Sequence, residues 1–100
     1  MIARFWRGWA LAGKAHLYRR HFRDIVRPHV EALPGFRSAW LLEKRENGEV
    51  EFLAVTHWQS LESVKAFAGD DVSVAKVEPQ TRAVLSRFET TATHYRIDVS

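Results

Sequence analysis

The dipeptide Asn47-Gly48 constrains the fold of this chain more than any other feature. It separates two segments of strand-like composition, residues 36–46 and residues 49–58. Asn-Gly suits a two-residue turn because both of its positions need a positive φ, which Gly adopts freely and Asn tolerates. The sequence therefore predicts an antiparallel hairpin of two long strands in the middle of the chain.

A long amphipathic helix is predicted before the hairpin, over residues 15–33. Pro28 interrupts it and should bend it, because proline removes a backbone hydrogen bond. The sequence Pro34-Gly35 is typical of a helix end. The apolar residues recur at three- and four-residue spacing and so share one face: Tyr18, Phe22, Ile25, Val26, Val30 and Leu33.

The hairpin is also flanked by a first strand and a short helix. Residues 2–9 alternate bulky apolar residues with arginine, which indicates a strand. After the hairpin, Ser60 is a typical N-cap for a helix over residues 61–68, because its hydroxyl can accept a hydrogen bond from an unpaired backbone N–H. Gly69 suits the end of that helix.

The last quarter of the chain predicts one more helix and one more strand. Pro79 suits the first turn of a helix that runs through Leu85. Residues 88–98 are rich in β-branched and aromatic residues and predict a strand. The order β-α-β-β-α-β predicts an α+β, ferredoxin-like fold with helices on one face of an antiparallel sheet. We expect a single domain over residues 1–100.

The predicted strands are apolar on both faces of the sheet. Residues 40–42 (Trp-Leu-Leu) and residues 52–55 (Phe-Leu-Ala-Val) are uninterrupted apolar runs. Trp6 and Trp9 should point to opposite sides, because their separation is odd. A second apolar face needs a cover, and a second copy of the chain can supply it. We therefore expect a homodimer through the sheet.

Composition excludes several kinds of site. The chain has no cysteine, so disulfides, thiolate metal sites and cysteine nucleophiles are excluded. Neither a metal-ligand spacing nor a glycine-rich phosphate loop is present, so we expect no metal and no cofactor. Arg4 and Arg7 interrupt the apolar start, which therefore does not resemble a secretory signal. No apolar run approaches a membrane span, and we expect a cytoplasmic protein without a membrane partner.

The charge of the chain is uneven. Residues 1–30 hold seven Lys and Arg residues against one acid, Asp24, within a net charge of +3. A basic half can attract an acidic ligand or a nucleic acid. RNA binding by a ferredoxin-like sheet requires a basic-aromatic signature on a central strand, and E-V-E-F-L-A-V-T at residues 49–56 does not match it. We therefore expect no nucleic-acid partner.

Together with the order of the elements, the long helix and four segments after it carry a family resemblance over nearly the whole chain: L-P-G-F at 33–36, W-Q-S-L-E-S at 58–63, A-F-A-G-D-D at 66–71 and F-E-T-T-A-T-H-Y at 88–95. Together they resemble the antibiotic biosynthesis monooxygenase family of the dimeric α/β-barrel superfamily. The resemblance implies a protomer that dimerises through its sheet and holds a pocket between sheet and helices. It also implies oxidation of quinol-like or anthrone-like aromatics by O₂ without metal or flavin, since the electron-rich substrate anion itself reduces oxygen.

Another branch of the same superfamily degrades haem. A resemblance to that branch would require three residues: an asparagine on the first strand, a tryptophan on the helix after the hairpin and a histidine ten residues later. In this sequence the single asparagine is Asn47 in the turn, Phe67 stands at the tryptophan position and Val77 at the histidine position. The resemblance therefore favours cofactor-free oxidation over haem degradation.

Two histidines are candidates for a general base, because the ordinary pKa of histidine lies near neutrality. His57 lies at the end of the second hairpin strand, and His21 lies on the apolar face of the long helix, three residues after Tyr18. Each of them can equally be a structural histidine. His57 and Trp58 are adjacent on a strand, so their side chains should point to opposite faces, and only one can face the pocket.

Four residues are candidates for binding a substrate: Arg4, Trp6, Trp58 and Phe67. Arg4 and Trp6 share one face of the first strand, and an arginine on a buried strand needs a partner or faces a ligand. Trp58 is favoured as a core residue. Phe67 is expected in the core as well and can also line the pocket.

Three functions remain open at this point: two that use the pocket, and RNA binding, which the mismatch at residues 49–56 disfavours and which a strongly salt-dependent affinity for single-stranded RNA would support. The first is a cofactor-independent monooxygenase in which His57 or His21 takes a proton from an aromatic hydroxyl and Arg4 steadies the resulting anion. The second is a non-enzymatic module of the same fold that binds a small aromatic or apolar ligand. The two differ by turnover, because a binding module consumes no oxygen.

Overall fold

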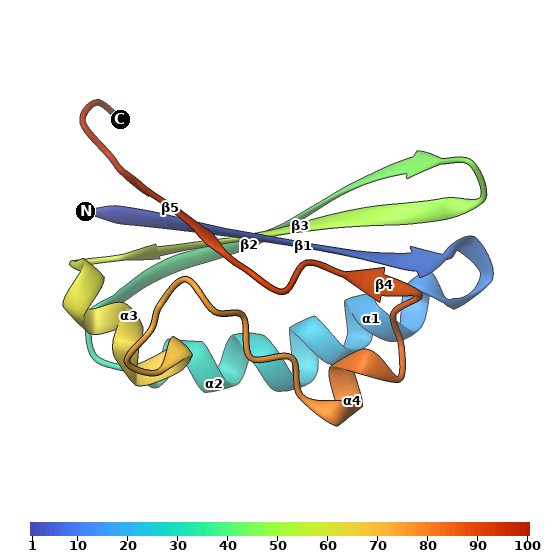
Figure 1. The fold of residues 1–100 in the computed structure, drawn as a ribbon, viewed down its shortest axis with the longest axis horizontal. Helices are drawn as coiled ribbons and strands as arrows, with labels where there is room; N and C mark the ends of the chain where they lie inside the picture. Colours follow the sequence, from blue (N-terminus) through green and yellow to red (C-terminus); the bar gives the residue numbers. More distant parts are fainter.

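A twisted antiparallel sheet forms one layer of the computed structural model, which describes residues 1–100, and the helices all cover the same face of that sheet (Figure 1). The strands are β1 (Ile2–Leu11), β2 (Phe36–Glu46), β3 (Glu49–Trp58), β4 (Arg87–Phe88) and β5 (Thr93–Arg96). The sheet order is β2-β3-β1-β4, and β5 also pairs with β1. The predicted ferredoxin-like α+β fold is confirmed.

The predicted hairpin is present as β2 and β3. Its turn has two residues with positive φ, Asn47 at 53° and Gly48 at 78°, as an Asn-Gly hairpin turn requires. The ladder runs from the Glu46–Glu49 pair beside the turn to the far ends of both strands. Because β3 pairs with β2 on one side and β1 on the other, it is fully hydrogen-bonded and positions the residues that follow.

The long helix is interrupted near Pro28, as the sequence predicts. It consists of α1 (Ala15–His21), a π-helical turn η2 (Phe22–Val26) and α2 (Arg27–Glu31), after a short 3₁₀ turn η1 (Ala12–Lys14). The backbone N–H of Arg27 bonds the carbonyl of Phe22, five residues back. Pro28 has no N–H to donate, and the widened turn before it absorbs the missing hydrogen bond.

The short helix α3 (Leu61–Ala68) begins and ends as predicted. The Ser60 hydroxyl oxygen accepts from the backbone N–H of Ser63 at 3.2 Å, and the Ser63 hydroxyl oxygen accepts from the N–H of Ser60 at 3.1 Å. This reciprocal pair fixes the start of the helix. Gly69 ends it with φ of 88°, a conformation that other residues rarely adopt. None of the helices combines the length and the apolar character that spanning a membrane requires.

The prediction of one continuous strand over residues 88–98 is wrong. Gly8 pairs with Phe88 while Phe5 pairs with Thr93, so this segment carries two extra residues relative to β1 and splits into β4 and β5. The predicted last helix is also shorter, because α4 (Pro79–Arg82) does not reach Leu85. The residues between β4 and β5 bond a different partner, the segment between α3 and α4.

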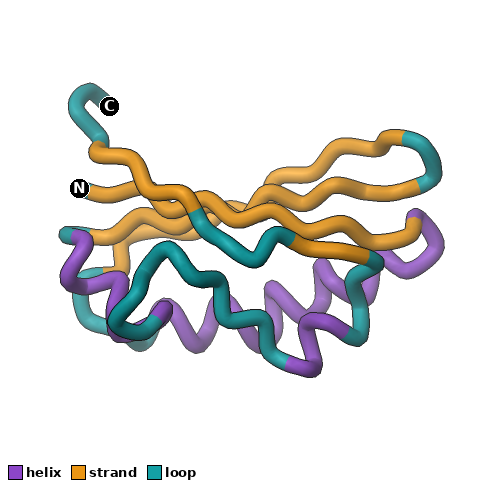
Figure 2. The backbone as a smooth tube through the Cα atoms, in the orientation of Figure 1, coloured by secondary structure: helices purple, strands orange, loops and turns teal.

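That segment, residues 69–78, is here called the strap. Figure 2 shows it as a loop between α3 and α4 that runs alongside the long helix. Its backbone is tied to the C-terminal segment by two hydrogen bonds of 2.9 Å, from Ala75 N–H to the Thr90 carbonyl and from Ala92 N–H to the Ser73 carbonyl. The strap therefore closes over the helix side of the sheet without forming a regular element.

The core consists of two separate clusters on the inner, helix-covered face of the sheet. One gathers the long helix around Tyr18 and Phe52, and the other packs α3 around Trp58. On β3, Ala54 and Thr56 lie between Phe52 and Trp58 on the same face. Because their side chains are small, they leave space between the two clusters.

Candidate functional site

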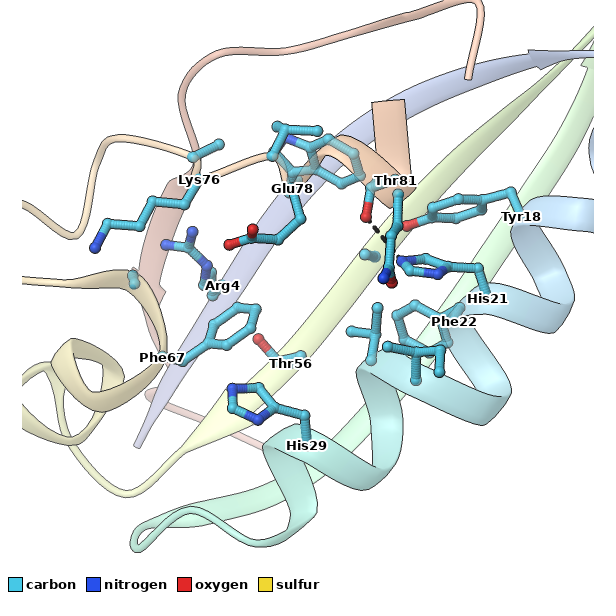
Figure 3. A pocket seen from close by; sticks show the side chains of 18 residues that line it. Arg4, Tyr18, His21, Phe22, His29, Thr56, Phe67, Lys76, Glu78 and Thr81 are labelled. Atoms are coloured by element: carbon cyan, nitrogen blue, oxygen red, sulfur yellow. Dashed lines mark hydrogen bonds between the residues drawn. The ribbon is translucent and has the colours of Figure 1, made fainter. Parts of the chain in front are cut away.

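A cavity of about 380 Å³ occupies this space between the sheet, the long helix and the strap (Figure 3). Its floor is made by β1 and β3, its wall by the long helix, and its cover by α3, the strap and α4. The residues that line it are Arg4, Trp6, Tyr18, His21, Phe22, Ile25, Val26, His29, Ala54, Thr56, Phe67, Ala68, Ala75, Lys76, Val77, Glu78, Gln80 and Thr81. The volume lies at the small end of the range for ligand pockets.

His21 lies at the C-terminal end of α1 and faces the cavity. Its Nε2 lies 2.8 Å from the Oγ1 of Thr81, which α4 places directly beside the imidazole at the same end of the cavity (Figure 3). Burial lowers the pKa of His21, because the protonated imidazole loses hydration there. The ring is therefore neutral at neutral pH and can accept a proton.

Tyr18 lies one helical turn before His21 and points its hydroxyl into the same end of the cavity (Figure 3). The ring packs on Phe52 with 4.8 Å between the ring centroids, and the residue is buried. Burial raises the pKa of Tyr18, so the phenol stays protonated at neutral pH. A protonated phenol is a hydrogen-bond donor for an oxygen that becomes anionic.

Arg4 lies on β1 in the cavity floor and is only 5% exposed. Its Nη1 donates to the Val72 carbonyl of the strap at 2.7 Å and to the Nε2 of His94 on β5 at 3.0 Å. Burial lowers the pKa of Arg4 to about 10, and the side chain remains a cation at neutral pH. His94 accepts this hydrogen bond through Nε2, and burial and the charge of Arg4 lower the pKa of His94.

Two aromatic residues complete the cavity around Arg4. The guanidinium carbon of Arg4 lies 5.6 Å from the centroid of the Phe67 ring, within the range of a cation–π contact. The Trp6 indole N–H donates to the Glu89 carbonyl at 2.7 Å. This bond holds the extra residues between β4 and β5 against the sheet and fixes the orientation of the indole.

The structure brings four of the six predicted site residues together: Arg4, Trp6, His21 and Phe67 all line the cavity. Trp58 does not line it. Trp58 is fully buried, and its indole N–H donates to the Thr56 Oγ1 at 2.8 Å. It packs against Phe67 and supports the cavity from below.

His57 is the residue for which the expected position needs correction. It points to the outer face of the sheet, where its ring centroid lies 4.5 Å from that of Trp40. The sheet separates His57 from the cavity, because Thr56 and Trp58 on either side of it occupy the inner face. The roles of the predicted residues remain predictions, but His57 cannot form the pocket wall.

Several residues of the cavity were not predicted from the sequence. Tyr18 could have been found, because it precedes His21 by three residues and shares its helical face. Thr81, Lys76 and Glu78 lie on the strap or on α4, where no periodic pattern reports a facing direction. His94 was missed as the partner of Arg4 because the register of the last strand decides that pairing.

The polar groups of the cavity are suited to an organic ligand. No group of three or more His, Cys, Asp or Glu side chains is arranged to hold a metal ion. The imidazoles of His21 and His29 reach the cavity singly, from different turns of the long helix. The lining therefore presents the aromatic side chains of Phe67 and Trp6 together with the polar groups of Arg4, Tyr18 and His21.

These features define a small ferredoxin-like protein with a ligand cavity covered by a strap. The model of the antibiotic biosynthesis monooxygenase family matches residues 1–75, and the chain belongs to this family. No curated protein matches the sequence.

Solved structures share the fold over nearly the whole chain. SnoaB, a cofactor-independent oxygenase from Streptomyces nogalater, is 16% identical, with coverage of 99% of this chain and 95% of that chain and a TM-score of 0.66. A monooxygenase from Streptomyces coelicolor in complex with nanaomycin D is 15% identical, with coverage of 99% and 88% and a TM-score of 0.68. The haem degrader MhuD of Mycobacterium tuberculosis, with two haems bound, is 21% identical, with coverage of 100% and 98% and a TM-score of 0.65.

Proposed function

We propose that this protein is a cofactor-independent monooxygenase that oxidises a small quinol-like or anthrone-like aromatic with O₂. The observation that carries the proposal is the convergence of three groups on one apolar cavity: the neutral imidazole of His21, the protonated phenol of Tyr18 and the cation of Arg4. A base, a donor for a phenolate-type oxygen and a cation are the groups that such a reaction needs from a protein.

The first step is removal of a proton from the bound aromatic. The imidazole of His21 accepts the proton, and Thr81, whose Oγ1 lies 2.8 Å from Nε2, keeps the imidazole oriented. The Tyr18 hydroxyl donates a hydrogen bond to the oxygen on which the negative charge develops. Because the cavity is lined mainly by apolar side chains, this charge is poorly hydrated, and the hydrogen bonds stabilise it more strongly than they would in water.

The second step is the reaction of the anion with oxygen. In an anthrone, the carbon anion at the methylene position transfers electrons to O₂ and forms a C–O bond, which gives a hydroperoxide after protonation. Loss of the second methylene proton and cleavage of the O–O bond release water and leave a ketone. One oxygen atom enters the product and the other leaves as water, so the substrate supplies all the electrons.

The known chemistry of two relatives in fold supports this proposal. SnoaB is a cofactor-independent oxygenase, and the Streptomyces coelicolor enzyme is a monooxygenase that binds nanaomycin D. MhuD, which degrades haem, shares the fold as well. Fold alone does not choose between these activities, and the arrangement of His21, Tyr18 and Arg4 is the reason to prefer the aromatic oxygenase.

We also propose that the protein is a homodimer that pairs through the outer face of the sheet. Three large side chains on this face are widely exposed: Trp40 by 47%, Leu42 by 49% and Tyr95 by 60%. They surround Phe5 and Val55 on the neighbouring strands. A contiguous apolar patch of this kind is typical of an interaction surface, and two-fold pairing would cover it.

Oxygen uptake with an anthrone tests the proposed reaction. Purified protein should consume O₂ in proportion to its concentration, in the presence of a metal chelator and without added flavin, above the rate with boiled protein. With ¹⁸O₂, one labelled atom should appear in the new carbonyl of the product. Binding of the anthrone at one molecule per protomer without any oxygen uptake would contradict the proposal and favour a binding module.

A further inference from the structure

We propose that the cavity contains a carboxylate subsite at Arg4, and that the substrate is therefore an aromatic acid whose carboxylate lies at the end opposite the reacting hydroxyl. This inference rests on the proposed function, because it names the class of substrate that the same cavity accepts. It is carried by the hydrogen bonds, the charge and the burial of Arg4, and by the position of Arg4 relative to His21 and Tyr18.

The guanidinium of Arg4 keeps one of its two donor edges free. An arginine has five N–H donors, and Nη1 uses both of its own on the Val72 carbonyl and on His94. Nε and Nη2 have no acceptor in the protein. The only side-chain nitrogen or oxygen that is buried and without a hydrogen bond is Nε of Arg7, so these two nitrogens of Arg4 stay accessible from the cavity.

Nε and Nη2 together form the side of the guanidinium that binds a carboxylate with two parallel hydrogen bonds. The orientation of this edge is fixed from behind by Nη1, which is bonded to the strap and to β5, and by the ring of Phe67. A preorganised fork loses little side-chain entropy when it binds an anion. The geometry thus favours a planar carboxylate over a neutral group.

Arg4 forms no ion pair within the protein. No carboxylate oxygen lies within 4.0 Å of any of its nitrogens. Six other arginines, all more exposed than Arg4, have such a partner: Arg7, Arg19, Arg23, Arg27, Arg87 and Arg96. A buried cation without a counter-ion is costly, and an anionic ligand would remove that cost.

The two ends of the cavity differ in chemistry, as Figure 3 shows. Arg4 and Lys76 lie at one end, and Tyr18 and His21 lie at the other, with the Phe67 ring beside Arg4. Glu78 of the strap also lines the cavity and forms no ion pair with Arg4 or Lys76. A ligand with a carboxylate at one end and a hydroxyl at the other matches the cations Arg4 and Lys76 and the polar groups Tyr18 and His21. Glu78 lies at the same end as the two cations, so its charge reduces the preference for a carboxylate.

Binding of matched naphthalene probes without oxygen tests the subsite independently of turnover. The probes are 6-hydroxy-2-naphthoic acid, with its two groups at opposite ends, and 2-naphthol, which lacks the carboxylate. Titration calorimetry should show the acid bound about 10- to 100-fold more tightly, the range for a hydrogen bond to a charged group. The isomer 3-hydroxy-2-naphthoic acid, whose groups are adjacent, should lose most of this advantage.

Variants separate Arg4 from general electrostatics. Arg4→Met should abolish the preference for the acid, so that the two probes bind with similar affinity, whereas Arg7→Met, on the outer face of the same strand, should leave the preference unchanged. Glu78→Gln should increase the affinity for the acid only. In the wild type, the NMR signal of the Arg4 Nε–H should shift with the acid and not with 2-naphthol, which needs no variant to fold.

Equal affinities for the two probes in the wild type would overturn the carboxylate subsite, and so would a preference that survives in folded Arg4→Met. These outcomes are distinct from failure of the proposed oxidation. A protein that binds the acid through Arg4 but consumes no oxygen would retain the subsite and lose the enzymatic function. A protein that oxidises an anthrone but does not distinguish the two probes would retain the function and lose the subsite.

Discussion

Arg4 and Arg7 lie three residues apart on the same strand and face opposite sides of the sheet. Arg4 faces the helices, has no carboxylate partner and bonds a backbone carbonyl and a histidine. Arg7 faces outward, and its Nε lies 3.2 Å from Glu51 Oε2 in an ion pair that lacks the alignment of a hydrogen bond. Thus the arginine on the helix-covered face is available to a ligand, whereas the arginine on the outer face is paired with a carboxylate of the protein.

His21 and His57 also differ in the side of the sheet on which they lie. His21 contacts Thr81 at one end of the cavity, whereas His57 packs on Trp40 on the outer face of the sheet. On the inner face, polar and titratable side chains line the cavity, whereas the outer face exposes large apolar side chains to solvent. Strand alternation assigns each residue to a face, but the surrounding elements decide what that face does.

The largest expected effect concerns the neighbours His57 and Trp58. Trp58→Ala should lower the free energy of unfolding by about 3–5 kcal/mol, because the indole is fully buried in the inner core. His57→Ala should cost less than about 1 kcal/mol, as is usual outside the core. Urea unfolding of the two variants measures both values. Equal losses would contradict the assignment of the two side chains to a core face and an outer face.

The outer face should control association. Leu42→Lys should weaken the dimer at least about 30-fold, because an exposed apolar side chain of the outer face would be replaced by a charge without a partner. Leu61→Lys is the matched control, since Leu61 is exposed to a similar extent, 44% against 49% for Leu42, but lies on α3 in the helix layer. Sedimentation over a range of concentrations measures the change. A wild-type protein that stays monomeric at high concentration would refute the proposed dimer.

On the inner face, Thr81 should act as a positioning residue for His21. Thr81→Val should lower kcat/KM for the anthrone about tenfold, corresponding to the loss of one hydrogen bond. It should also move the acidic limb of the pH profile, because the hydroxyl contacts the titrating ring. Thr93→Val, on β5 opposite Phe5, is the control. A lower rate with an unmoved pH profile would indicate a structural role only.

The smallest expected effect is the pH dependence of stability. Burial lowers the pKa of both His21 and His94 in the folded protein. As the pH falls below about 6.5, the unfolded chain binds protons that the folded chain does not, so stability should decrease. His94→Gln keeps an acceptor for Arg4 and should reduce the slope by less than about 1.4 kcal/mol per pH unit, the limit for one proton. Thermal unfolding between pH 7 and pH 5 measures the slope.

Local signals in the sequence predicted much of the fold. The Asn47-Gly48 turn, the Ser60 cap and the Gly69 stop depend on backbone conformation and nearby hydrogen bonds, and all three are present. The effect of Pro28 was also predictable, since the missing N–H acts within one helical turn. The split of the last strand was not, because it depends on hydrogen bonds to the strap, far away in the sequence.

Only part of the candidate site was predicted, because local patterns place residues on a face but do not show what covers that face. Alternation gave the opposite directions of His57 and Trp58 and the shared face of Arg4 and Trp6, but it cannot tell which face the helices cover. The cavity arises because Ala54 and Thr56 are small, and an irregular strap covers them. Neither the absence of large side chains nor an irregular cover produces a periodic pattern.

The central claim is that the helix-covered face carries the chemistry and the outer face does not. The most direct test is the initial rate of oxygen uptake with an anthrone by His21→Ala and His57→Ala, compared as folded proteins at pH 7.5. We predict a loss of about 100-fold or more for His21→Ala, as expected for removal of a general base, and the wild-type rate for His57→Ala. Full activity in His21→Ala together with lost activity in His57→Ala would contradict the account.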